Sequence, residues 1–228
     1  MKKSKKHYLF EMELIPLNVI ATVIFFAGII LFILLLNLTD LKISFDFNTD
    51  YKYLMILLVP YFALHEILHF IGYYLNGADA SKLTFGVHLE KGVFCCSCKQ
   101  IVNKKCIMWS LIYPFLFIGV ITCILGFIIN SSVLILLSIA NISGAAGDLM
   151  MFFNFLKIKD FEFAEYDNPI GFSLYSSEDL SKRKMFGLKF IETRDELECH
   201  VTKKLTVSKK SIYYLIGWAL LCFAYCVI

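Results

Sequence analysis

Three residues in one apolar stretch have the types and the spacing of a metal site. They are His65, Glu66 and His69, which form the sequence HEILH within the segment 53–76. Residues four apart lie on one face of a helix, so both imidazoles can reach one metal ion. Glu66 is offset by about 100° and can reach a water in the open coordination position. The pattern therefore indicates a metal site with a water within reach of Glu66. Two core histidines and a glutamate on a helix edge are the alternative, which a lipid-embedded helix disfavours because unpaired His and Glu are costly there.

The composition indicates that this motif lies in a membrane. Of the 228 residues, 58% are hydrophobic and 18% are charged, whereas a soluble domain averages about half apolar and about a quarter charged. These values exclude a disordered chain, a coiled coil and a collagen-like repeat, and they argue against an ordinary soluble enzyme. The net charge of +3 is too small to indicate a nucleic-acid partner.

Five apolar stretches predict transmembrane helices, because a bilayer core needs about 20 apolar residues as a helix. The first four are long enough, and the last is marginal. They are 15–37, 53–76, 107–129, 132–156 and 211–228. Pro60 and Pro114 predict kinks in the second and third stretches. We therefore expect an all-α integral membrane protein with about five transmembrane helices.

The positive charges predict the orientation of these helices. On an alternating path, 20 of the 22 Lys and Arg residues fall on one side, which the positive-inside rule makes the cytoplasm. The prediction is a multi-pass protein of the cell membrane, with a cytoplasmic N-terminus and the C-terminus at the outer face. Its parts would be a cytoplasmic tail (1–14), a membrane-embedded metalloprotease core (15–156) with a cytoplasmic insert (77–106), a cytoplasmic segment (157–210) and a C-terminal transmembrane helix (211–228).

Asp148 is the natural third metal ligand. Among the Asp, Glu, Lys, Arg and His residues, only it and the three polar residues of HEILH fall inside the apolar stretches. A charged side chain costs at least about 2.5–3.5 kcal/mol at the bilayer centre, so four ionisable residues in otherwise uncharged helices imply a common function. A catalytic zinc usually has three protein ligands. At 1.5 Å per residue, Asp148 and the motif both lie about 12 Å below the predicted cytoplasmic surface.

The run before Asp148 is small and polar within an apolar stretch. Asn141 and Ser143 could bind a substrate backbone or orient a ligand, and plain helix packing is the alternative. Gly144 and Gly147 could loosen the helix, so that Asp148 reaches the metal.

The chain resembles a known family at these residues. HEILH in one span, followed by Gly147-Asp148 in a later span, is similar to the putative zincin peptidases of bacterial membranes. That family is in turn similar in layout to site-2 proteases, the intramembrane zinc proteases. The resemblance covers about residues 55–175.

The resemblance implies roles for four residues. His65, His69 and Asp148 would hold Zn²⁺, and Glu66 would be the general base. Site-2 proteases usually present Leu-Asp-Gly after an Asn and a Pro, whereas here Asp148 follows a Gly and precedes a Leu. The details of substrate clamping therefore do not carry over.

Two short stretches of the insert, 82–89 and 92–98, predict a β-hairpin, and an extended substrate could add to its edge as a strand. The second stretch contains Cys95, Cys96 and Cys98. Cys95 and Cys98 form a CxxC that could start a second metal site. Its further ligands would be His88 and Cys106, or Cys199 with His200. Unpaired, reduced thiols are the alternative that a cytoplasmic location favours.

The segment after residue 157 is the most charged part of the chain. Residues 160–167 alternate acid and apolar side chains, and the basic cluster Ser181–Lys184 could contact anionic lipid headgroups. A solvated surface is the alternative for both.

The sequence thus predicts an intramembrane zinc metalloendopeptidase. Its partners would be membrane lipids and a peptide or membrane-protein substrate. The alternative is a catalytically inactive metal-binding membrane protein that acts as a regulatory module. A transporter with an ion relay is a third possibility, against which the absence of inverted repeats counts.

Overall fold

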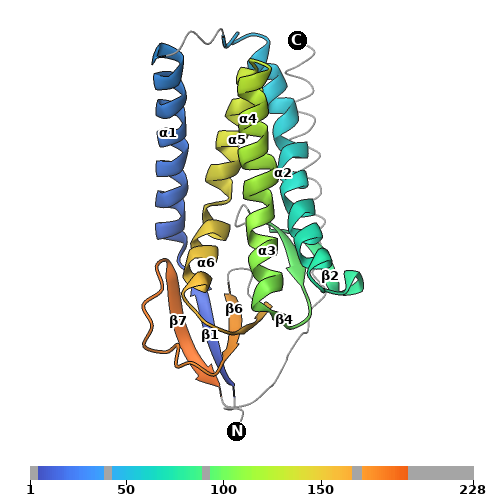
Figure 1. Cartoon of the computed structure of the whole chain (residues 1–228), viewed down its shortest axis with the longest axis vertical. Coiled ribbons are helices and arrows are strands. Elements are labelled where there is room, and N and C mark those ends of the chain that lie inside the picture. The colour runs from blue at the N-terminus through green and yellow to red at the C-terminus, as the bar shows by residue number, and fades with distance from the viewer. Residues whose placement is uncertain (1–4, 39–42, 89–92, 166–170, 195–228) are drawn as a thin grey trace.

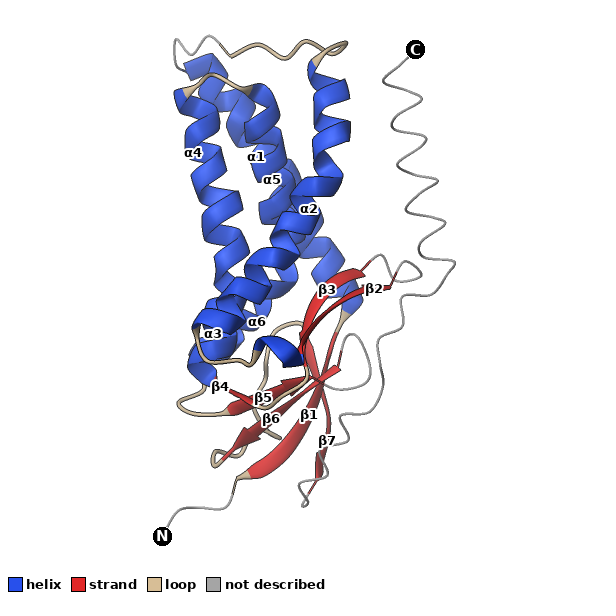
Figure 2. Cartoon of the chain, turned by 90° about the vertical axis from the view of Figure 1, so that its right-hand side faces the viewer, coloured by secondary structure: helices blue, strands red, loops and turns tan. Residues whose placement is uncertain are grey.

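The computed structural model describes residues 5–38, 43–88, 93–165 and 171–194. Within these ranges, a bundle of long helices stands on a β-sheet (Figures 1 and 2). The fifth predicted transmembrane stretch, 211–228, lies outside the described residues, as do Cys199 and His200.

The helices follow the predicted apolar stretches closely. They are α1 (Leu14–Leu38), α2 (Asp50–Leu75), α3 (Lys104–Pro114), η3 (Phe115–Val120), α4 (Ile121–Ile128), α5 (Ser132–Gly144) and α6 (Ala146–Leu156). By length and composition, three helical segments can cross a membrane, and the bent pair of α5 and α6 can form a fourth span. The three segments are Leu14–Leu38, Asp50–Leu75 and Lys104–Ile128. The chain therefore has the helices of a membrane protein.

The stretch 132–156 is not one straight helix. It bends by 51° between α5 and α6, and Ala145 at the break leaves helical geometry with ψ 8°. The flanking Gly144 and Gly147 carry no side chains that would hold the two halves in line. The expected loosening of the helix is thus confirmed, and it places Asp148 in the first turn of α6.

The two prolines differ in effect. Helix α2 continues through Pro60, whereas Pro114 is followed by the π-helical turn η3. In η3 the Ile121 N–H reaches back five residues to the Leu116 carbonyl. Because Pro114 donates no N–H, the regular bonding pattern is interrupted there and backbone carbonyls become available to other groups.

The expectation of an all-α protein with only a hairpin underestimates the β-structure. A five-stranded antiparallel sheet has the order β4-β5-β6-β1-β7. Its strands are β1 (Lys6–Met12), β4 (Val102–Asn103), β5 (Glu162–Glu165), β6 (Gly171–Ser176) and β7 (Leu188–Arg194). The supposed N-terminal tail therefore supplies an inner strand, in which the residues from His7 to Phe10 are buried. Its partners β6 and β7 come more than 150 residues later, so no local pattern reveals the pairing.

The predicted hairpin is confirmed. Strands β2 (Leu83–His88) and β3 (Val93–Cys98) pair antiparallel, with Leu83 opposite Cys98. They form a sheet of their own. Strand β3 packs against α2, and Figure 2 shows the hairpin beside the end of that helix.

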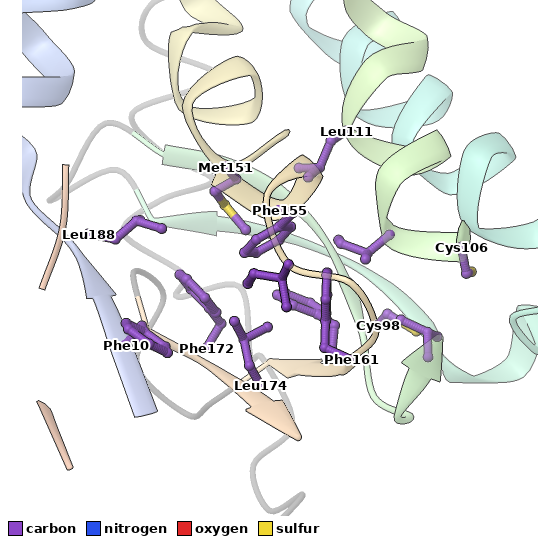
Figure 3. Close-up of a cluster of buried hydrophobic side chains, with 14 of the residues drawn as sticks. Phe10, Cys98, Cys106, Leu111, Met151, Phe155, Phe161, Phe172, Leu174 and Leu188 are labelled. Carbon is purple, nitrogen blue, oxygen red and sulfur yellow. The ribbon is translucent and has the colours of Figure 1, made fainter. Parts of the chain in front are cut away.

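A cluster of buried aromatic and aliphatic side chains joins α6 to the sheet (Figure 3). Phe155 of α6 is fully buried and its ring lies 4.9 Å from that of Phe161 and 5.6 Å from that of Phe172. Burying each such ring contributes about 1.5–3 kcal/mol. On the same helix, the Asn154 side chain donates to the Phe186 carbonyl and accepts from its N–H. The sheet thereby fixes the helix that carries Asp148.

Candidate metal centre

Two imidazoles and one carboxylate meet where α2 passes the start of α6. His65 and His69 lie on the buried face of α2, with 7% and 8% of their surface exposed. The His65 Nε2 lies 3.1 Å from the His69 Nε2 and 3.2 Å from Asp148 Oδ2. The His69 Nε2 lies 3.4 Å from the same carboxylate oxygen. The structure therefore brings together the three residues that the sequence predicts as metal ligands.

A backbone carbonyl on α3 orients His69. The His69 Nδ1 lies 2.9 Å from the Ser110 carbonyl oxygen, which can only accept, so Nδ1 carries the proton. In an unbroken helix this carbonyl would accept from the N–H of residue 114, but Pro114 has none. The Ser110 hydroxyl in turn donates a hydrogen bond of 3.1 Å to the His69 carbonyl.

The close approach of α2 and α3 depends on Gly72. A Cβ atom built on Gly72 would lie 2.6 Å from the Ser110 Cα and 3.0 Å from its backbone nitrogen. Any side chain there would push the helices apart, because the contacted atoms are backbone. Gly72 lies one turn after His69 on α2, so it sets the distance that the His69–Ser110 bond requires.

A buried amide on α5 orients His65 in the same way. The His65 Nδ1 lies 2.8 Å from Asn141 Oδ1, while Asn141 Nδ2 donates to the Pro114 carbonyl at 3.2 Å. The Pro114 carbonyl can only accept, which fixes the amide orientation and makes His65 Nδ1 a donor. Asn141 is 1% exposed. Its contacts favour an orienting role over direct contact with a substrate.

The resulting arrangement fits a zinc ion. A metal ligand must be a neutral imidazole, and in a neutral ring whose one proton is on Nδ1, Nε2 presents a lone pair toward the Asp148 carboxylate. Three such atoms 3.1–3.4 Å apart repel one another unless a cation lies between them. A tetrahedral zinc with bonds of about 2.0–2.2 Å holds its ligand atoms roughly 3.3–3.6 Å apart, and two histidines with a carboxylate are a known catalytic ligand set.

Glu66 lies beside this cluster. One of its carboxylate oxygens and one ring nitrogen each of His65 and His69 all lie within 4.8 Å of one another. The Cys96 backbone of β3 hydrogen-bonds to the Glu66 carboxylate. Its Oε2 is buried and has no hydrogen-bond partner among the described residues. A buried acceptor without a partner is costly, which is typical of a group reserved for chemistry.

Ser143 lies away from this arrangement. Its hydroxyl donates to the Ala21 carbonyl of α1 at 2.9 Å. This contact is helix packing of the kind that the sequence left open as the alternative to substrate binding.

No second metal cluster is found in the described part of the chain, where His65, Glu66 and His69 form the one such group. Cys95, Cys96, Cys98 and Cys106 are free thiols. The predicted second site is only partly covered by this result, because the side chain of His88 and the Cys199-His200 pair are not described.

Several residues that build the site carry no motif. Ser110 and Pro114 act through backbone carbonyls, which any residue type possesses. Gly72 could have been noticed as a small residue one turn after the motif, since small residues mark close helix contacts in membranes.

Comparison with known proteins gives one family. The model of the family described as "Putative zincin peptidase" matches residues 57–160. The match begins before the HEILH motif on α2 and ends after α6, so it contains every residue of the metal centre described above. Comparisons with curated proteins and with solved structures give no significant match. Over residues 57–160, which include the whole metal centre, the chain is therefore similar to the putative zincin peptidase family.

Proposed function

We propose that this chain is a zinc-dependent endopeptidase whose active site lies within the membrane, as in site-2 proteases. The observation that carries the proposal is the convergence of the His65 and His69 Nε2 atoms and one Asp148 carboxylate oxygen, 3.1–3.4 Å apart, beside a buried glutamate whose Oε2 has no hydrogen-bond partner among the described residues. His65, His69 and Asp148 would hold the zinc.

Each residue then has a defined task. A zinc bound there would lower the pKa of a bound water toward about 7 and polarise the scissile carbonyl. Glu66 accepts the proton of the attacking water and passes it to the leaving amine. Asn141 and the Ser110 carbonyl keep the two imidazoles in the tautomer that leaves Nε2 free.

The fold supports a depth and a side for the proposed site. Asp148 lies eight residues before the end of α6 at Leu156, which is about 12 Å along a helix. Among the described residues, Lys and Arg gather at the end of the bundle that carries the sheet, whereas Lys52 lies in the first turn of α2 at the opposite end. The positive-inside rule supports a cytoplasmic sheet, a cytoplasmic N-terminus and a multi-pass topology.

The hairpin offers a place for an extended substrate. The backbone of Cys96 faces Glu66, and the Cys98 N–H faces Glu165. This edge of β3 therefore points away from β2 and toward the metal centre. A peptide added there as a strand would lie next to Glu66, with its carbonyls exposed to attack, which a regular helix does not allow.

The test compares wild-type chain with Glu66→Gln in native membranes. Both should contain about one zinc per chain, and new N-termini in the membrane proteome should appear only with the wild type. Glu162→Gln is a matched control, because Glu162 lies on β5 and pairs with Lys5.

Equal sets of new N-termini from wild type and Glu66→Gln would overturn the peptidase proposal. Zinc retained in both variants would then favour the metal-binding module without turnover. Loss of zinc in Glu66→Gln would contradict the role of Glu66 as a base that does not hold the metal.

A further inference from the structure

Glu165 joins three elements around the metal centre. It is the last residue of β5, and its Oε1 accepts from the Cys98 N–H of β3 at 3.0 Å. The same oxygen lies 3.5 Å from the hydroxyl of Tyr73 on α2. The Ser97 side chain adds a further hydrogen bond. One carboxylate thus links the main sheet, the hairpin and the helix of the HEILH motif.

The contacted amide belongs to the edge of β3 that faces the metal centre. Cys96 and Cys98 are two apart, so their backbone N–H groups point to the same side of the strand. The Glu66 carboxylate accepts a hydrogen bond from the Cys96 N–H, and the Glu165 carboxylate accepts one from the Cys98 N–H. The Lys99 N–H points the other way and bonds to the Lys82 carbonyl at 2.8 Å. Glu165 therefore occupies the last outward-facing N–H of β3, at the end of the same strand edge that contacts Glu66.

The carboxyl group of Glu165 is buried and held by several hydrogen bonds. Burial raises its pKa to about 7, although the bonds from Cys98, Ser97 and Tyr73 act in the opposite direction. Glu162, three residues earlier on the same strand, is a contrast. Its side chain is 43% exposed and pairs with Lys5 at 2.8 Å. A surface carboxylate could be lost at little cost, whereas removing Glu165 leaves a buried amide without an acceptor.

We propose that Glu165 is a positioning residue that fixes strand β3 against α2 and so sets the substrate-binding edge next to Glu66. This inference rests on the proposed peptidase function. It assigns to β5, which lies beyond the matched family segment, a direct part in building the site. The side-chain oxygen is the essential group, since all its partners are donors.

The test measures amide hydrogen exchange of the segment 93–98 in zinc-loaded protein in lipid nanodiscs. Glu165→Ala should raise exchange there by about tenfold, the effect expected when one buried hydrogen bond is lost. Glu165→Gln should restore protection, because its amide oxygen can accept from Cys98. Tyr73→Phe should have a smaller effect, and Glu162→Ala should have none.

Zinc content and the exchange of the segment 60–70 should stay unchanged in Glu165→Ala, while new N-termini in the membrane proteome decrease. Unchanged exchange of 93–98 in that variant would overturn the inference. An increase in amide exchange that also includes the segment 60–70 would overturn it too. So would a failure of Glu165→Gln to restore the protection of 93–98. Exchange requires no cleavage, so an inactive wild type would refute the peptidase function without affecting this result.

Discussion

The His69 Nδ1 donates to the Ser110 carbonyl at 2.9 Å, and that carbonyl is available because Pro114 four residues later has no N–H. A proline that interrupts one helix thus supplies the acceptor that orients a histidine on another. The carbonyl of Pro114 itself accepts from Asn141, which orients His65. One interruption in the third span therefore controls both imidazoles.

Gly72→Ala should weaken metal binding by about 10–100-fold, the usual cost of disturbing the partner of a ligating histidine. The new Cβ would lie 2.6 Å from the Ser110 Cα and would separate α2 from α3. Zinc affinity measured by competition with a chelator checks this result. Gly126→Ala is the matched control, because a Cβ there would crowd the Ile135 side chain at 2.7 Å in a contact between α4 and α5 that involves no metal ligand. Equal affinities for both variants would contradict the role of Gly72.

Asn141→Ala should also lower zinc affinity by about 10–100-fold, because the proton of His65 is then free to move to Nε2. Asn141→Asp should recover part of the affinity, since it keeps an acceptor for Nδ1. Ser143→Ala should bind zinc normally and lose only a packing contact with Ala21. If Asn141→Ala bound zinc fully yet cleaved poorly, a direct role in substrate binding would replace the orienting role.

Glu165 should make stability depend on pH. Its folded pKa of about 7 lies above the ordinary value of 4.5, so its contribution is present below about pH 4.5 and is lost as pH rises through 7. Zinc-loaded wild type should lose about 1–2 kcal/mol relative to Glu165→Gln between pH 5.5 and 8. The titratable groups that face Glu165 are His69 and Tyr73 of α2 and Cys95, Cys96 and Cys98 of β3.

Thermal unfolding of both proteins in the same nanodiscs checks this prediction. Parallel pH profiles of wild type and Glu165→Gln would show that another group is responsible for any pH dependence.

The sequence predicts those parts of the site that are ionisable residues within apolar stretches. Histidine, glutamate and aspartate are expensive in apolar helices, so His65, Glu66, His69 and Asp148 were found from local composition alone. Equal depth along two helices then predicts that Asp148 lies near the histidines. The 51° bend that brings it there is larger than the loosening that Gly144 and Gly147 predict.

The remaining parts depend on contacts that local patterns do not carry. Strand β1 pairs with β6 and β7, and only Glu13 separates it from the apolar helix α1, so the sequence gives it no separate signal. The acid and apolar alternation around β5 has the period of a strand, but the same pattern also fits a charged, solvated surface. Glu165 could be identified only once β3 was known to approach the end of that strand.

The most direct test is a zinc-loaded structure with anomalous scattering measured at the zinc edge. We expect one ion bound by the Nε2 atoms of His65 and His69 and by the Asp148 carboxylate, each at about 2.0–2.2 Å. An ion that binds elsewhere, or a histidine pair that binds zinc while Asp148 stays apart, would contradict the account.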